Sequence, residues 1–152
     1  MKVDSDEYFM SIAISEAMKA LEKDEVPVGS IITMQNKIIS KGHNSSIQDN
    51  DPTAHAEINV IRKASRLHQN YRLNFHTIYT TLEPCPMCLS AIIHSRIQRI
   101  VFGAYDFKTG SCGSCFNMLN KECFNHYPEI LGGVEEKKCS KILRDFFEIK
   151  RS

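Results

Sequence analysis

The segment Pro84-Cys85-Pro86-Met87-Cys88 is the most informative part of this sequence. Cys85 and Cys88 are three positions apart, so on a helical turn both sulfur atoms project from the same face. Pro86 suits the first positions of a helix, where its missing N–H group costs little. The positive end of the helix dipole lowers the pKa of nearby thiols, and zinc binds thiolates. The segment therefore predicts half of a zinc site at the start of a helix.

The earlier triplet His55-Ala56-Glu57 supplies what the cysteines lack. His55 offers a third ligand, and Glu57 places a carboxylate beside the metal; three protein ligands with an open fourth position are typical of catalytic zinc. A helix over residues 53–69 and a returning strand over residues 75–82 would each cover roughly 25 Å, which brings His55 back to Cys85. The alternative is that Cys-x-x-Cys is a redox pair or buried packing, and the His-x-Glu motif at this distance favours the metal.

These two motifs resemble the signature of the zinc-dependent nucleoside and nucleobase deaminases. The resemblance is closer to the tRNA-specific adenosine deaminases of bacteria, and it extends over nearly the whole chain. It implies a three-layer α/β/α cytidine-deaminase-like fold with a mixed sheet of roughly five strands, formed by a single zinc-dependent deaminase domain over residues 1–152. The further segments that carry it are Glu25-Val26-Pro27-Val28-Gly29, Gly42-His43-Asn44, Asp51-Pro52-Thr53-Ala54-His55-Ala56-Glu57, Val101-Phe102-Gly103-Ala104, Lys108-Thr109-Gly110 and Asp145-Phe146-Phe147.

The composition is that of a globular domain. The 152 residues are 42% hydrophobic and 24% charged, which allows one domain with a real core. No apolar run approaches the ~18 residues of a membrane span, and the acidic start is unlike a signal peptide, so we expect a cytoplasmic protein with no membrane partner. Two of the six cysteines are assigned to the metal, and a core of this size needs no disulfide framework, so we expect reduced thiols.

The net charge of +1 hides an uneven distribution along the chain. Residues 1–25 carry seven acids and three bases, whereas residues 137–151 carry six bases and two acids. Between residues 58 and 105 the one acid is Glu83, against Arg62, Lys63, Arg66, Arg72, Arg96 and Arg99. The asymmetry predicts a phosphate-facing surface beside the site; solvated helix faces are the alternative.

Hydrophobic periodicity and turn residues divide the chain into alternating helices and strands. We expect helices over residues 7–23, 53–69, 87–95 and 135–150, and strands over residues 28–34, 37–41, 75–82, 97–102 and 129–132, with a long loop over residues 103–127. Gln35-Asn36 reads as a hairpin turn, and Thr53 or Asp51 as the cap of the second helix. This alternation predicts an α/β sheet layered with helices, with the site at the carboxyl ends of strands.

The resemblance also implies residues that bind the substrate. Asn44 hydrogen-bonds the target base, the loop with Asp106 and Lys108 contacts the nucleotide backbone, and the last helix touches RNA through Phe147. The homodimer that the family implies has a candidate interface at 91–93, which is equally a core segment. We interpret Cys112 and Cys115 as loop residues rather than a second metal site.

The predicted function is that of a hydrolase with one Zn²⁺ per subunit on His55, Cys85 and Cys88. A zinc ion there would activate water for attack on C6 of adenine, and Glu57 would carry protons to N1 and to the leaving ammonia. The resemblance implies that the adenosine is at the first (wobble) anticodon position of tRNA, bound as an anticodon stem-loop and converted to inosine. Two alternatives stay open: deamination of a free base or nucleoside such as guanine or cytosine, and a non-catalytic zinc module that binds RNA.

Overall fold

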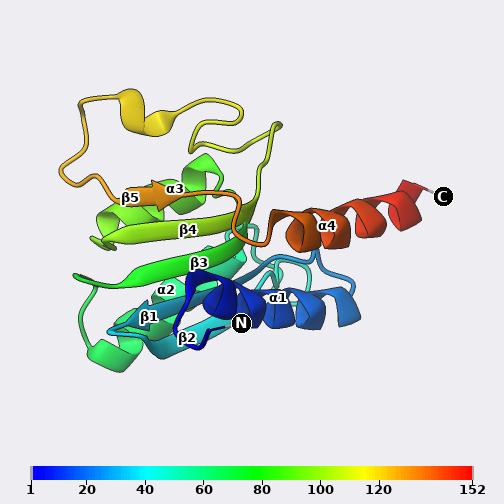
Figure 1. The fold of residues 1–152 in the computed structure, drawn as a ribbon, viewed down its shortest axis with the longest axis horizontal. Helices are drawn as coiled ribbons and strands as arrows, with labels where there is room; N and C mark the ends of the chain where they lie inside the picture. Colours follow the sequence, from blue (N-terminus) through cyan, green and yellow to red (C-terminus); the bar gives the residue numbers. More distant parts are fainter. Residues whose placement is uncertain (1, 152) are drawn as a thin grey trace.

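The computed structural model describes residues 2–151 as a mixed sheet between two layers of helices (Figure 1). The five strands follow the order β2-β1-β3-β4-β5, in which β2, β1 and β3 are antiparallel neighbours and β3, β4 and β5 run parallel. Their bounds are β1 Gly29–Met34, β2 Lys37–His43, β3 Thr77–Leu82, β4 Arg99–Ala104 and β5 Glu129–Leu131. The predicted α/β/α architecture is therefore confirmed.

Two helices cover each face of the sheet. Helices α1 (Asp6–Glu22) and α4 (Glu136–Arg151) share one hydrophobic cluster with the sheet, and α2 (Ala56–His68) and α3 (Pro86–His94) share the other. In Figure 1 the end of α4 extends past the strands. Because the sheet is covered on both sides, its central strands are buried on both faces.

The strand register keeps the two cores separate. Successive residues of a strand point to opposite faces, and paired residues on neighbouring strands point to the same face. The row on the α1 side is Ile31, Tyr79 and Val101, and the row on the α2 side is Ile32, Ile78 and Ile100.

The first hairpin has a two-residue turn at one end and a close helix contact at the other. Gln35 and Asn36 have φ values of 51° and 61°, as a two-residue hairpin turn requires, so the predicted turn is confirmed. At Gly29 a Cβ atom would lie 2.0 Å from the carbonyl oxygen of Ala13. Glycine at this position therefore allows α1 to pack directly onto β1.

The predicted start of the second helix is wrong. Helix α2 begins at Ala56, and its N-cap is His55, which has an extended backbone. Asp51 instead accepts hydrogen bonds from the N–H and hydroxyl of Thr53, at 2.8 and 2.7 Å, and closes a separate turn. Neither Thr53 nor Asp51 caps the helix.

Within the described part of the chain, the other predicted helices and strands are present with ends shifted by one or two residues. The predicted loop contains a single 3-10 turn, Met118–Asn120. Of the two readings for residues 91–93, core packing is confirmed for Ile92 and Ile93, which are buried. None of the helices in residues 2–151 combines the length and apolar composition that a membrane crossing requires.

Candidate active site

The site forms where four strands meet one edge of the sheet. Strand β1 starts at this edge, and β2, β3 and β4 end at it, because β2 and β3 both run antiparallel to β1. Asn44, Cys85 and Asp106 come shortly after the ends of β2, β3 and β4. His55, at the start of α2, completes the set, so residues far apart in the sequence converge as expected for an α/β sheet.

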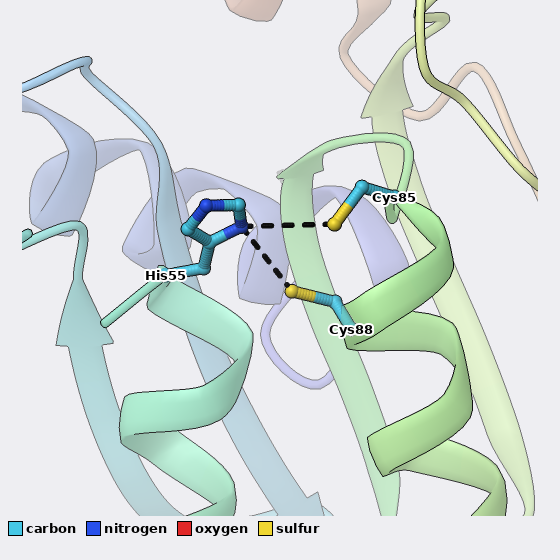
Figure 2. A group of neighbouring side chains, drawn as sticks. All are labelled: His55, Cys85 and Cys88. Atoms are coloured by element: carbon cyan, nitrogen blue, oxygen red, sulfur yellow. Dashed lines mark hydrogen bonds between the residues drawn. The ribbon is translucent and has the colours of Figure 1, made fainter. Parts of the chain in front are cut away.

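The three predicted metal ligands lie together (Figure 2). The Nδ1 atom of His55 is 3.7 Å from Sγ of Cys85 and 3.4 Å from Sγ of Cys88. Tetrahedral zinc with ordinary Zn–N and Zn–S bonds would set these atoms about 3.6 Å apart. The donor set and its spacing therefore fit zinc, with a fourth position left for a non-protein ligand. Cys112 and Cys115 are not part of this cluster.

Two helix starts point at this cluster. His55 is the N-cap of α2, Cys85 is the N-cap of α3, and Pro86 occupies the first turn of α3 as predicted. The hydrogen bond with Cys88 and the nearby His55 lower the pKa of the Cys85 thiol to about 4. The same bond to Cys85, with burial, raises the pKa of the Cys88 thiol.

Glu57 is the buried acid of the site. Its side chain lines the same cavity as His55 and Cys85, although only 4% of the residue is exposed. Burial raises the pKa of Glu57 to about 7. A carboxyl with this pKa exchanges protons readily at neutral pH, which suits a general acid–base group.

Asn44 connects the site to α2. Its side-chain oxygen accepts a hydrogen bond of 2.7 Å from the backbone N–H of Ala56. Because that oxygen faces a donor, the amide NH₂ group is left for an acceptor in the cavity that Asn44 lines. An amide placed in this way can hold the ring of a base.

The cavity has a volume of about 640 Å³, within the usual range for ligand sites. It contains every predicted substrate-binding residue, and aromatic and basic side chains from the 105–109 loop and from α4 line it. The lining residues are Val26, Val28, Asn44, His55, Glu57, Leu82, Glu83, Cys85, Tyr105, Asp106, Phe107, Lys108, Thr109, Leu143, Arg144, Phe147 and Arg151. Cys88 does not line the cavity and is fully buried.

Known proteins share this sequence pattern. Residues 3–104 match the family model of the cytidine and deoxycytidylate deaminase zinc-binding region. The tRNA-specific adenosine deaminase of Haemophilus influenzae is 45% identical over 152 residues, covering 99% of this chain and 88% of the relative. That of Bacillus subtilis is 44% identical, covering 93% and 88%. The chain belongs to the tRNA-specific adenosine deaminase family.

Solved structures agree with this membership. A structure from a study of A-to-I editing by tRNA:A34 deaminases at the wobble position of transfer RNA superposes with a TM-score of 0.87 at 39% identity, over 90% of this chain and 99% of that one. A guanine deaminase of Nitrosomonas europaea shares the fold, with a TM-score of 0.80 at 19% identity, over 93% and 84%. The resemblance in the sequence is thus confirmed at the level of family and fold.

A buried carboxylate that sequence reasoning missed holds one wall of the deaminase cavity. Glu83 is 2% exposed, and its two oxygens accept hydrogen bonds from the backbone N–H groups of Asp106, Cys112 and Ser114, at 2.9–3.2 Å. The sequence feature that could have identified Glu83 is that it is the one acidic residue between residues 58 and 105. Glu83 therefore anchors both ends of the loop that carries Lys108.

Sequence reasoning also missed a second buried carboxylate, Glu25. Glu25 is 2% exposed and accepts hydrogen bonds from the backbone N–H groups of Ile47 and Gln48, at 3.1 and 2.9 Å. It fixes the loop that follows Asn44.

Asp106 shapes its own loop. One carboxylate oxygen accepts hydrogen bonds from the N–H groups of Lys108 and Thr109, and the other accepts one from the hydroxyl of Thr109. The oxygen that accepts from the hydroxyl retains acceptor capacity for a ligand. The residue predicted to bind substrate is thus also the residue that closes a tight turn at the mouth of the cavity.

The predicted basic surface divides into separate groups. A second cavity, of about 370 Å³, lies beyond the 45–49 loop and is lined by Lys23, His43, Ser45, Gln48, Asp49, Asn59, Arg62, Lys63 and Arg66. Arg62 has a weak ion pair with Asp51 at 3.4 Å, and Lys63 donates to a backbone carbonyl. Arg99, in contrast, forms a close ion pair with Asp6 at 2.7 Å. This second cavity is the concentrated part of the basic surface.

Proposed function

We propose that the protein deaminates adenosine hydrolytically to inosine at the wobble position of tRNA, as a single-domain cytoplasmic enzyme. The observation that carries the proposal is the combination of Glu57 and the His55–Cys85–Cys88 cluster in one cavity whose mouth is aromatic and basic. A site for a free base alone gains nothing from the cations at the mouth, whereas an RNA strand brings phosphates to them. The curated relatives are named as tRNA-specific adenosine deaminases.

The residues of the cluster and of the cavity each have a role in the proposed reaction. His55, Cys85 and Cys88 would hold zinc, which supplies a Lewis acid that activates water near neutral pH. Glu57 takes one proton from the attacking water and delivers it to N1 of the purine; it then carries the second proton of that water, from the new C6 hydroxyl, to the amino group that leaves as ammonia. Asn44 directs its amide N–H toward an acceptor on the base, which keeps C6 near Glu57.

The surrounding residues address the rest of the RNA. An anticodon loop presents unpaired bases, so placing one in the cavity requires no disruption of a duplex. Lys108, Arg144 and Arg151 supply positive charge where the flanking backbone would leave the cavity. Phe147 lines the same mouth and is 43% exposed, which leaves its ring available to a base.

The test is a direct comparison of substrates. We expect rapid inosine formation in an RNA anticodon stem-loop with adenine first in the anticodon, and poor activity on its DNA counterpart, free adenosine, guanine and cytidine. Comparable kcat/KM values for a free base or nucleoside would show that the substrate is a small molecule rather than tRNA. Zinc binding and RNA binding without any deamination would support the non-catalytic alternative.

We also propose that the enzyme works as a homodimer, which the family resemblance implies. Sedimentation of the zinc-loaded protein at micromolar concentration, alone and with the stem-loop, measures this directly. A monomer in both samples would contradict it.

A further inference from the structure

Phe107 has an unusual position for an apolar side chain. It is 77% exposed, the largest fraction among the exposed large hydrophobic residues of the described chain, and it lines the mouth of the active-site cavity. Residues 2–151 provide no ring or cation partner for it. A single exposed apolar residue is common on protein surfaces, so its place and its support are what matter.

The backbone around Phe107 is firmly held. The carbonyl of Asp106 accepts a hydrogen bond from the N–H of Gly110 at 2.9 Å, and the Asp106 carboxylate accepts from the N–H groups of Lys108 and Thr109. The N–H of Asp106 is bound by buried Glu83. Phe107 is therefore presented from a closed turn.

Gly110 shows how tightly this turn is packed. A Cβ atom there would lie 2.3 Å from the carbonyl oxygen of Asp106 and 2.5 Å from Cδ of Glu83. Because the backbone of this turn is already ordered, binding through Phe107 carries no entropic penalty for ordering the loop, only that of the side chain itself.

The neighbours of Phe107 indicate the ligand. Lys108 and Arg144 provide cations for phosphates, and Glu57 lies in the interior of the same cavity. When one base of an RNA strand is inserted toward Glu57, the adjacent nucleotides remain at the mouth. Exposed aromatic rings bind unpaired bases by stacking, and this interaction tolerates any base because every base has a π face.

We propose that Phe107 forms a stacking subsite for the nucleobase adjacent to the target adenosine. This inference rests on the proposed function and adds a residue that positions RNA without touching the reacting atoms. Stacking of the neighbouring base would hold the strand in register and so keep the reacting carbon correctly oriented. Removal of the Phe107 ring would therefore lower kcat as well as raise KM.

The first experiment compares side chains at this position on an RNA anticodon stem-loop. We expect Phe107→Ala to lower kcat/KM by roughly 5- to 100-fold, the effect typical of removing one base–aromatic stack. Phe107→Tyr keeps the π face and should restore most of the activity, whereas Phe107→Leu should resemble the alanine variant. Full activity of the leucine variant would reduce the subsite to a simple apolar contact and overturn the proposal.

The deciding experiment removes the partner base. Stem-loops carrying an abasic nucleotide immediately 5′ or 3′ of the target adenosine are assayed with the wild type and Phe107→Ala, as a double-mutant cycle. On one of the two substrates we expect the two enzymes to become equal, which also identifies the stacked neighbour. An undiminished difference between the enzymes on both abasic substrates would contradict the proposal.

Phe116→Ala is the matched control. Phe116 lies further along the same connection, is 45% exposed and does not line the cavity, so its replacement should leave kcat/KM unchanged. Zinc content and thermal unfolding establish that each variant is folded. A wild type inactive on the intact stem-loop would refute the proposed function, whereas an active wild type with an equally active Phe107→Ala variant would refute only the stacking subsite.

Discussion

The side-chain oxygen of Asn44 accepts a 2.7 Å hydrogen bond from the backbone N–H of Ala56. This bond ties the end of β2 to the first residue of α2 and so sets His55 on one side and Glu57 on the other. His55 of the metal cluster, and Glu57 and Asn44, the residues proposed for proton transfer and base binding, therefore all lie next to one interaction. Damage to it should therefore be visible in both stability and catalysis.

The two roles of Asn44 can be separated by a pair of variants. Asn44→Ala removes the cap of α2 and should lower the free energy of unfolding by about 1 kcal/mol, together with kcat/KM. Asn44→Asp keeps an acceptor for Ala56 but has no amide donor, so stability should be retained while activity falls. Urea unfolding and steady-state deamination measure the two effects. Full activity of the aspartate variant would show that the Asn44 amide does not bind the base.

Glu57→Gln tests the acid–base group with little change in shape. We expect zinc content and stem-loop affinity to remain, while kcat falls by at least about 100-fold, the usual contribution of such a group. Metal analysis, RNA binding and single-turnover rates are measured on the same preparation. If the variant retained more than a tenth of the activity, Glu57 would not transfer the protons and would only orient its neighbours.

Replacement of a metal ligand should remove both metal and stability. Cys85→Ala or Cys88→Ala is expected to abolish the one zinc per chain and to lower the unfolding temperature, because metal binding and folding are coupled. Cys123→Ala, at an exposed free cysteine, is the control and should keep full zinc. Stoichiometric zinc in either ligand variant would contradict the assigned site.

The buried carboxylate of Glu83 should control the order of the substrate loop. Glu83→Ala leaves the N–H groups of Asp106, Cys112 and Ser114 without their acceptor, at an expected cost of roughly 1–3 kcal/mol in the free energy of unfolding. Amide hydrogen exchange at these three residues should accelerate, and KM for the stem-loop should rise. Unchanged exchange at all three would show that the loop is held by other interactions.

The second, basic cavity should contribute to RNA affinity through charge alone. If Lys63 and Arg66 bind phosphates, replacing both by alanine should reduce the slope of log K against log salt by roughly 0.7 for each phosphate that is no longer neutralised. Lys37→Ala, at the opposite end of β2, serves as the control and should leave the slope unchanged. An equal slope in the double variant and the wild type would show that the RNA phosphates do not bind at Lys63 and Arg66.

The zinc cluster was predictable from the sequence because its signals are local. Cys85, Pro86 and Cys88 occupy one helical turn, and the spacing to His55 follows from the lengths of one helix and one strand. The hairpin at Gln35-Asn36 and the runs of β-branched and aromatic residues in β1, β3 and β4 likewise depend on turn chemistry and composition within a few residues. Such features appear directly in the order of amino acids.

Other features were settled only by tertiary contacts. The expected cap at Thr53 or Asp51 is the favoured local solution, yet Asn44, which follows β2, satisfies the N–H of Ala56. Ile92 and Ile93 read equally as interface or core until α3 is packed against the sheet.

The sequence by itself therefore determined the order of helices and strands, the metal ligands and the family. The folded chain alone decided that Glu83 holds a wall of the cavity, that Glu25 holds the loop after Asn44, and that Asp106 closes the turn presenting Phe107. The physical reason is that a buried carboxylate must be matched by hydrogen-bond donors, and here the donors are backbone N–H groups on segments distant in the chain. Backbone donors are the same for every residue type, so no pattern of side chains reveals them before the chain folds.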